Sequence, residues 1–244
     1  MNGAELVETH QWSFGSWFGY ENSQFFMINS EIVVHTWIIM GLLALMLAGI
    51  NFALHHTTLG RFIILKVVSF FVDLTKQSLG TFVYSHCVFA SSLFIFIALC
   101  NTASLIPWLD EPTRDLNTTL ALGTISFLYI QGVTIRTHGL GSYLKGLFQP
   151  FFLMLPLNVI GKLSSIVSIS FRLFGNIFGG AIIAKLYFGT IAGSVILELF
   201  GLLSGINFLI IGFFTLFEGL LQAFVFTMLT LTYLSIGMQE GCGH

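Results

Sequence analysis

The stretch SISFRLFGNIFGG, residues 168–180, places one arginine, Arg172, in the middle of an apolar run. Arg172 and Asn176 are four residues apart, so on a helix they share one face. Ser168 and Ser165 lie about one and two turns earlier on nearly the same stripe. A charge inside a bilayer costs at least about 2.5–3.5 kcal/mol, so an arginine retained here indicates a functional site if the chain spans a membrane.

The composition indicates a polytopic membrane protein. Of the 244 residues, 55% are hydrophobic and 8% are charged, against about 25% charged in an ordinary soluble domain. A net charge of −2 and the lack of a basic tract exclude a nucleic-acid-binding protein. The three cysteines are dispersed and form neither a CxxC nor a Cys/His cluster, so we expect no metal site, and nothing indicates a cofactor.

The apolar segments predict an all-α fold with about five transmembrane helices plus interfacial amphipathic helices. The segment 61–80 carries four charged residues and is predicted to lie on the membrane surface. A short basic loop with glycine breakers is expected after the third span, at 136–146. The last two apolar blocks exceed the length of one upright span, so we expect long, tilted helices arranged as a hairpin, the first of them tilted, kinked or partly re-entrant. The predicted spans are 31–54, 86–109, 118–135, 151–188 and 195–238, the last interrupted at 202–207.

The charges of the short loops set the expected orientation and organisation. Lysine and arginine follow the first and third spans, whereas the loop after the second span is mainly acidic. The positive-inside rule then places the N-terminus outside and the C-terminus on the cytoplasmic or matrix side. We expect an N-terminal surface segment over 1–30 and a transmembrane domain over 31–244, whose two long helices lie at 151–190 and 207–238.

A second polar stripe lies in the final helix. Thr215, Glu218 and Gln222 are spaced i, i+3, i+7 on a background of phenylalanine and leucine. If this stripe faced that of Arg172, the two helices would enclose a hydrated path. Gly175 and Gly179 form a GxxxG pattern that permits another helix to approach closely.

Other polar residues of these blocks have simpler interpretations as well. Lys185 and Glu198 fit positions near helix ends, where their stems snorkel to the interface, and Lys162 fits an interfacial position. The hydroxyls of Ser165 and Ser168 can bond to carbonyls of their own helix. Lys162, Asn158, Lys185 and Ser165 also remain possible linings of an ion channel.

The segment FRLFGNIFGG, followed about fifty residues later by LLQAFVFTMLTLTYLSIG, resembles subunit a of F-type ATP synthases. The segments NTASLIPW and DEPTRDLNTTLALG resemble the end of the family's second span and the loop and helix that follow it. The resemblance covers most of the chain. Arg172, Asn176 and Gln222 match the family's motif arginine, asparagine and glutamine.

The resemblance implies a membrane stator with two ion half-channels, in which the motif arginine faces the ion-binding carboxylates of a rotating ring. The implied partners are the c-subunit ring, the peripheral-stalk b subunits, the rest of the ATP synthase and membrane lipid. The implied location is the bacterial or mitochondrial inner membrane. A subunit of this kind has no catalytic residue, and no P-loop pattern occurs in the chain, so nucleotide chemistry would belong to other subunits.

The chain departs from the family's usual pattern at several polar positions. Ala181 and Thr215 stand where many members have acidic or histidine residues, and Asn158 and Lys162 stand at usual acidic positions. We expect Glu218 to take over part of this duty. The expected ion path runs along the two long helices 151–190 and 207–238. With Arg172 and Glu218 it includes Ser168, Asn176, Thr215 and Gln222. The coupling ion is expected to be H⁺, with Na⁺ as the alternative.

Two other classes of function compete with this interpretation. A secondary transporter with broken helices would bind a small solute, but the sequence shows no internal repeat. A purely structural anchor conflicts with the cost of a central arginine.

Overall fold

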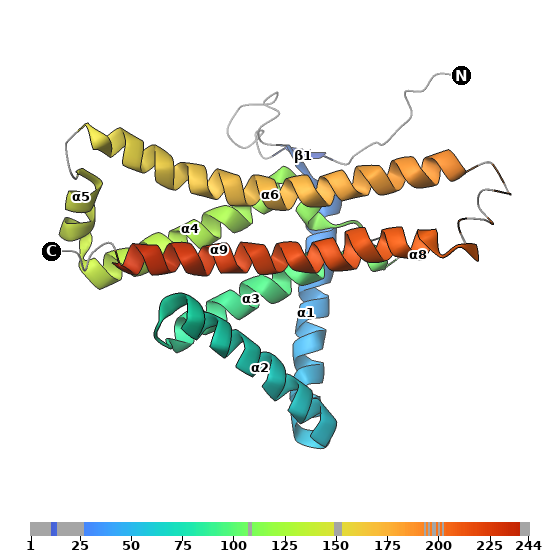
Figure 1. The fold of residues 1–244 in the computed structure, drawn as a ribbon, viewed down its shortest axis with the longest axis horizontal. Coiled ribbons are helices and arrows are strands. Elements are labelled where there is room, and N and C mark those ends of the chain that lie inside the picture. Colours follow the sequence, from blue (N-terminus) through green and yellow to red (C-terminus); the bar gives the residue numbers. More distant parts are fainter. Residues whose placement is uncertain are drawn as a thin grey trace.

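The computed structural model of the chain describes residues 11–13, 27–106, 109–148, 153–192, 194, 196, 199, 201 and 203–239. Within that part the chain is almost entirely helical, and the all-α prediction is confirmed (Figure 1). Two three-residue strands form one antiparallel pair before the first helix. The elements, in chain order, are β1 (Gln11–Ser13), β2 (Met27–Asn29), α1 (Ser30–His56), α2 (Thr58–Leu79), α3 (Tyr84–Asn101), η3 (Ala103–Leu105), η4 (Pro112–Arg114), α4 (Leu116–His138), α5 (Leu140–Phe148), α6 (Met154–Ile191), α8 (Ile206–Ile211), η5 (Gly212–Glu218) and α9 (Gly219–Gln239).

Five segments of the described chain are long and apolar enough to cross a membrane, and they correspond to the five predicted spans. The chain is therefore an integral membrane protein. Helix α2 forms over the predicted surface segment and is not among the five; its place at the membrane surface stays a prediction. The five segments are Glu31–His56, Tyr84–Leu105, Leu116–His138, Leu155–Ile191 and Ile206–Gln239.

Helix α6 and the segment α8–η5–α9 form a long antiparallel hairpin (Figure 1). Helix α6 has 38 residues without a break, which at 1.5 Å per residue is about 57 Å. The apolar stretch is thus one continuous helix and is not re-entrant. The predicted break before the last helix is confirmed, because Gly205 has a φ of 74° and α8 begins at the next residue.

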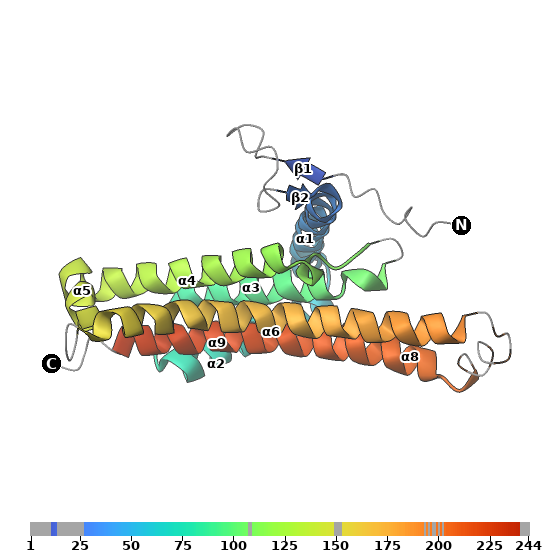
Figure 2. The same cartoon turned by 90° about the horizontal axis from the view of Figure 1, so that it is seen from above.

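The prediction of a basic loop after the third span is wrong in one respect, because most of that segment is helical. Gly139, with a φ of 79°, ends α4, and the chain then forms the nine-residue helix α5. The glycines of LGSYLKGLF favour a loop, but its apolar residues recur at helical spacing and outweigh them. Helix α5 closes the end of the bundle at which α6 begins (Figure 2).

The core lies where α3 and α4 pack against one side of the hairpin (Figure 2). Small residues bring the backbones together there. A Cβ on Gly123 of α4 would collide with the hydroxyl of Ser170 on α6, and one on Gly237 of α9 would lie 2.6 Å from Oγ1 of Thr134 on α4. The main buried cluster joins four helices and consists of Leu93, Ile97, Ala98, Leu122, Ile169, Leu173, Ile177, Ala223 and Phe226.

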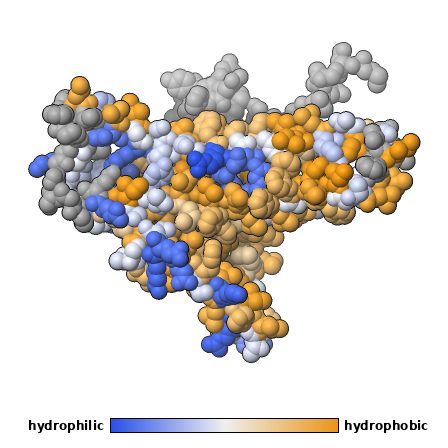
Figure 3. Space-filling view, viewed as in Figure 1, coloured by the Kyte–Doolittle hydropathy of each residue, from blue (hydrophilic) through white to orange (hydrophobic). Residues whose placement is uncertain are grey.

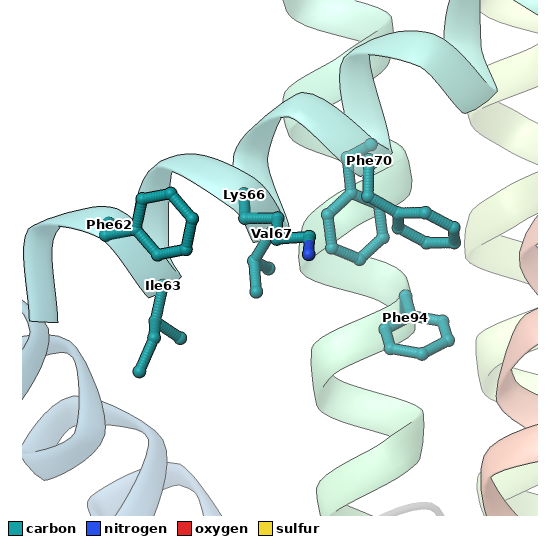
Figure 4. A pocket seen from close by; sticks show the side chains of 7 residues that line it. Phe62, Ile63, Lys66, Val67, Phe70 and Phe94 are labelled. Carbon is teal, nitrogen blue, oxygen red and sulfur yellow. The ribbon is translucent and has the colours of Figure 1, made fainter. Parts of the chain in front are cut away.

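An open apolar groove of about 550 Å³ lies between α2 and α3 (Figure 4). Lys66 is the one charged side chain on its wall. No residue of α6 or α9 lines this groove, so it is separate from the hairpin. The lining residues are Phe62, Ile63, Lys66, Val67, Phe70, Phe71 and Phe94.

Candidate functional site: the polar face of the α6–α9 hairpin

Arg172 is an exposed residue at the middle of α6. One face of the hairpin of α6 and α9 is covered by no other described helix (Figures 1 and 2). No hydrogen bond or ion pair joins the Arg172 side chain to another residue of the described chain. Apolar side chains of α6 such as Phe171 and Phe178 are also exposed. A guanidinium keeps its charge at every accessible pH. The described chain therefore supplies no anionic partner for this charge.

Asn176 joins the two arms of the hairpin one turn beyond Arg172. Its Nδ2 donates a hydrogen bond of 2.8 Å to Oε1 of Gln222 on α9. Gln222 is 1% exposed, and Asn176 is half-buried. An interhelical bond of this kind contributes about 0.6 kcal/mol on average within a membrane, and up to about 1.7 kcal/mol. The bond restricts the rotation of each helix about its own axis at the level of Arg172.

Glu218 is half-buried at the end of η5, against Gly180 of α6. A Cβ on Gly180 would lie 3.4 Å from Oε2 of Glu218 and 3.0 Å from Cδ1 of Phe214. The missing side chain of Gly180 thus makes room for the Glu218 carboxylate between the two helices. Glu218 and Gln222 are four residues apart, so the carboxylate and the Asn176–Gln222 bond lie on successive turns.

Element η5 is a π-helix rather than an α-helix. Such segments are rare and often occur at functional sites. The predicted stripe of Thr215, Glu218 and Gln222 assumes α-helical geometry throughout. Because a π-helix bonds i→i+5 and has wider turns, the half-buried Thr215 is rotated away from the line of Glu218 and Gln222. Nothing in the residue pattern 212–218 indicates this change of register.

The backbone of α9 is also held from α3, by a residue that sequence reasoning missed. Nδ2 of Asn101, the last residue of α3, donates a 2.8 Å hydrogen bond to the carbonyl of Gly219. Oδ1 of Asn101 accepts a bond of 2.8 Å from Thr113 of η4. Asn101 and Thr113 are both fully buried. A lone asparagine at the end of an apolar span was a signal, since a buried amide needs partners.

The space-filling view shows a compact hydrophilic patch on the otherwise apolar band formed by α6 and α9 (Figure 3). The accessible or half-buried polar residues in the middle of the two arms include Ser168, Arg172, Asn176, Thr215 and Glu218. A localised patch with one permanent cation, one amide pair and one carboxylate is suited to guiding a cation past the hairpin. In the described chain no group of three or more histidine, cysteine, aspartate or glutamate side chains forms a metal site.

The family model "ATP synthase A chain" matches residues 33–235. The chain belongs to the ATP synthase A chain family. It is similar to ATP synthase subunit a of Moorella thermoacetica, with 35% identity over 207 residues that cover 83% of this chain and 88% of the relative. It is also similar to the sodium-ion-specific subunit a of Propionigenium modestum, 33% identical, with 71% of this chain and 62% of the relative covered. A subunit a of Acaryochloris marina is 30% identical, with coverages of 88% and 87%.

Membership of the ATP synthase A chain family makes the chain a component of the ATP synthase complex, in its membrane-embedded stator. A place in the membrane explains why so few charges lie in its long helices. The match extends from α1 almost to the end of α9.

The remaining candidates for this subunit's ion path are distributed along α6. The Ser165 hydroxyl donates a 2.7 Å hydrogen bond to the carbonyl of Lys162, as the simpler interpretation expected, whereas Ser168 is exposed. Lys162 lies 4.6 Å from the ring centre of Tyr143 on α5. Asn158 is half-buried near the start of α6, and Lys185 is exposed near its end. Glu198 lies outside the described residues.

Gly175 and Gly179 were expected to permit the close approach of another helix, and no helix of the described chain approaches them closely. A Cβ on Gly175 or Gly179 would meet no atom of the described chain within 4 Å. These two glycines therefore do not permit close approach between helices of this subunit. Gly180, which meets η5, and Gly219, which meets α3, have that role, as do Gly123 and Gly237.

Proposed function

We propose that this subunit provides two ion half-channels at the interface with the rotating c-ring, and so couples ion flow across the membrane to ATP synthesis. The observation that carries the proposal is Arg172, unpaired within the described chain and exposed on the uncovered face of the hairpin beside the Asn176–Gln222 bond. A permanent cation on an apolar surface needs an anionic partner from outside the subunit. A ring carboxylate is that partner in this proposal.

Arg172 separates the two half-channels in this proposal and does not carry the ion. A carboxylate that passes Arg172 is stabilised in its ionised form, because a cation within a few ångströms favours the anion. A carboxylate that turns toward lipid must instead bind its cation, because a charge there is costly. The direction of rotation then follows from which half-channel opens to which side, and 100 mV supplies about 2.3 kcal/mol per elementary charge.

Glu218 acts as a relay carboxylate of one half-channel in this proposal, since it lies half-buried against Gly180 beside the amide pair. Asn176, Gln222, Thr215 and Ser168 supply polar groups along the same hairpin. Lys162, Asn158, Lys185 and Ser165 are the candidates for the outer ends of the path. The ion-translocating units are then 151–190 and 207–238, within a transmembrane domain of 31–244 that follows the surface segment 1–30.

The partners we propose are the c-ring on the Arg172 face and the peripheral-stalk b subunits elsewhere on the bundle. The proposed location is an energy-coupling membrane, bacterial or mitochondrial, with the N-terminus outside and the C-terminus on the cytoplasmic or matrix side. We propose H⁺ as the coupling ion. Na⁺ is the second candidate, because a relative with 33% identity is named sodium ion specific. Sodium-dependent protection from a carboxyl reagent at the ring would identify Na⁺.

Site-directed cross-linking tests the proposed ring interface. In the intact complex, with Cys87, Cys100 and Cys242 replaced by serine, the variant Gly175→Cys should cross-link to the c subunit, because Gly175 is exposed on the Arg172 face. The control Leu128→Cys on α4, 62% exposed and outside the hairpin, should not. Equal cross-linking of both, or of neither, would contradict the assignment of this face.

Glu218→Gln tests the relay role separately. The variant keeps the size of the side chain and its ability to form hydrogen bonds, but it removes the titrating carboxyl. We expect ATP-driven ion pumping to fall strongly while the complex assembles normally. Undiminished pumping would remove Glu218 from the ion path.

A further inference from the structure

We infer that Asn101 is a positioning residue for ion translocation: its bond to the Gly219 carbonyl holds the adjacent Glu218 against α6. The inference rests on the proposed relay role of Glu218. Asn101 lies on α3, outside the hairpin that carries the proposed ion path. It acts through the backbone of α9 and is not itself a relay group.

Gly219 brings the start of α9 into close contact with the end of α3. This residue is buried, follows Glu218 directly and begins α9 where the π-helix ends. A Cβ on Gly219 would lie only 3.1 Å from Cβ of Asn101, so the two helices meet here at close range. The carbonyl of Gly219 is therefore within direct reach of the Asn101 amide, at 2.8 Å.

The Asn101 side chain is held at both ends of its amide. It is 0% exposed, with Nδ2 bonded to Gly219 and Oδ1 bonded to Thr113. The Thr113 bond fixes the plane of the amide, so Nδ2 can point only toward α9. A buried amide that links three elements through two bonds is rigid, because releasing either bond leaves a polar group unpaired.

Two hydrogen bonds hold the start of α9 directly after Glu218. Asn101 holds α9 at Gly219 from the side of α3, and Asn176 holds it at Gln222 from the side of α6. Two constraints within one turn prevent α9 from rotating about its axis. These two bonds favour the position of Glu218 beside Gly180, at the point where the π-helix ends.

The variant Asn101→Asp tests the inference, since aspartate has nearly the same shape and keeps the acceptor for Thr113 but cannot donate to Gly219 when ionised. The matched control Thr113→Val removes only the bond from Thr113. The accessibility of position 218 is measured as the rate at which a maleimide labels Glu218→Cys in the intact complex, with the three native cysteines replaced by serine. A second labelling site, Ile236→Cys, lies in the same helix, and its native side chain is 45% exposed.

Asn101→Asp should increase labelling at position 218 by about three- to eighteenfold, the factor that corresponds to losing one interhelical hydrogen bond, and leave position 236 unchanged. Thr113→Val should have a smaller effect in the same direction. Equal increases at both positions would indicate general loosening and overturn the inference, as would no change at position 218. If Asn101→Asp does not assemble, Thr113→Val replaces it in the same comparison: a rise confined to position 218 supports the inference, and equal rises or no rise overturn it.

Pumping measurements separate this inference from the proposed function. With Glu218 present, Asn101→Asp should shift the pH profile of ATP-driven pumping. A simple loss of assembled complex would instead lower the pumping rate at every pH without shifting the profile. If Glu218→Gln pumps normally, the relay role fails, whatever the labelling shows. If Glu218→Gln is impaired but Asn101→Asp alters neither the labelling nor the pH profile, the positioning role alone fails.

Discussion

Gly180 is where a single methyl group should interfere with ion translocation. In Gly180→Ala the new Cβ would lie 3.0 Å from Cδ1 of Phe214 and 3.4 Å from Oε2 of Glu218. Carbon atoms pack at about 3.5–4.0 Å, so the ring of Phe214 must withdraw by about half an ångström or more. The carboxylate of Glu218 is displaced with it, because both side chains belong to η5.

The cost of this change follows from packing and helix propensity. Adding a methyl group to a packed contact typically costs about 1–3 kcal/mol. Alanine in place of glycine within a helix returns up to about 1 kcal/mol. The net cost to the arrangement in which Glu218 lies beside α6 is therefore about 1 kcal/mol, which lowers its population about fivefold. We expect a similar decrease in the rate of ion translocation.

ATP-driven pumping in membrane vesicles measures this decrease, normalised to the amount of assembled complex. The control is Gly161→Ala in the same helix, where the new Cβ meets no atom of the described chain within 4 Å. It makes the same gain in helix propensity without the contact. If the two variants pumped at equal rates, the proposed position of Glu218 against Gly180 would be refuted.

Three further predictions concern stability. Asn176→Leu and Gln222→Leu each leave a polar partner unpaired, so a double-mutant cycle on detergent unfolding should give a coupling of about 0.6–1.7 kcal/mol, and additive effects would argue against the bond. Burial raises the pKa of Glu111, which lies in the loop between α3 and α4. The folded chain then binds this proton more tightly than the unfolded chain, so the contribution of Glu111 to stability is greatest below the unfolded pKa and is lost as the pH rises through the folded pKa. Thermal unfolding across that range should show the loss, and Glu111→Gln should remove it; an unchanged pH dependence in the variant would exclude this cause. Replacing Lys162 by Gln removes its contact with the Tyr143 ring. A double-mutant cycle with Tyr143→Leu, which by itself also loses the 2.8 Å hydrogen bond from the Tyr143 hydroxyl to Gln131, should give a coupling of about 0.5–1 kcal/mol, and additive effects would exclude the cation–ring contact.

The membrane fold could be predicted because bilayer thickness imposes a length and a composition on each span. The five apolar segments, the break before Ile206 and the hairpin of long helices all follow from that constraint. Helix α5 could not be predicted with the same weight, because the glycines in LGSYLKGLF compete with its helical periodicity. Short helices are decided by small differences in propensity, and glycine alone does not exclude them.

Only those parts of the site that follow from the spacing of residues along one helix could be predicted. Arg172 and Asn176 share a face because α6 is regular, and Gln222 meets Asn176 as two facing polar stripes should. The π-register of η5 was not predictable, because no residue pattern separates it from an α-helix. Asn101 was missed for a different reason. Its partners, Gly219 and Thr113, come from other elements, and spacing along one helix contains no information about them.

The most direct test of the role of Arg172 is ATP-driven ion pumping by the intact complex with Arg172→Ala, with Arg172→Lys alongside. We predict that Arg172→Ala assembles, hydrolyses ATP without pumping and lets ions leak between the half-channels, because no fixed cation separates them. Arg172→Lys keeps a cation but not the planar guanidinium, so it should restrict the leak more than Arg172→Ala does. Coupled pumping by Arg172→Ala at the rate of the unmodified complex would contradict the separation of the half-channels by Arg172.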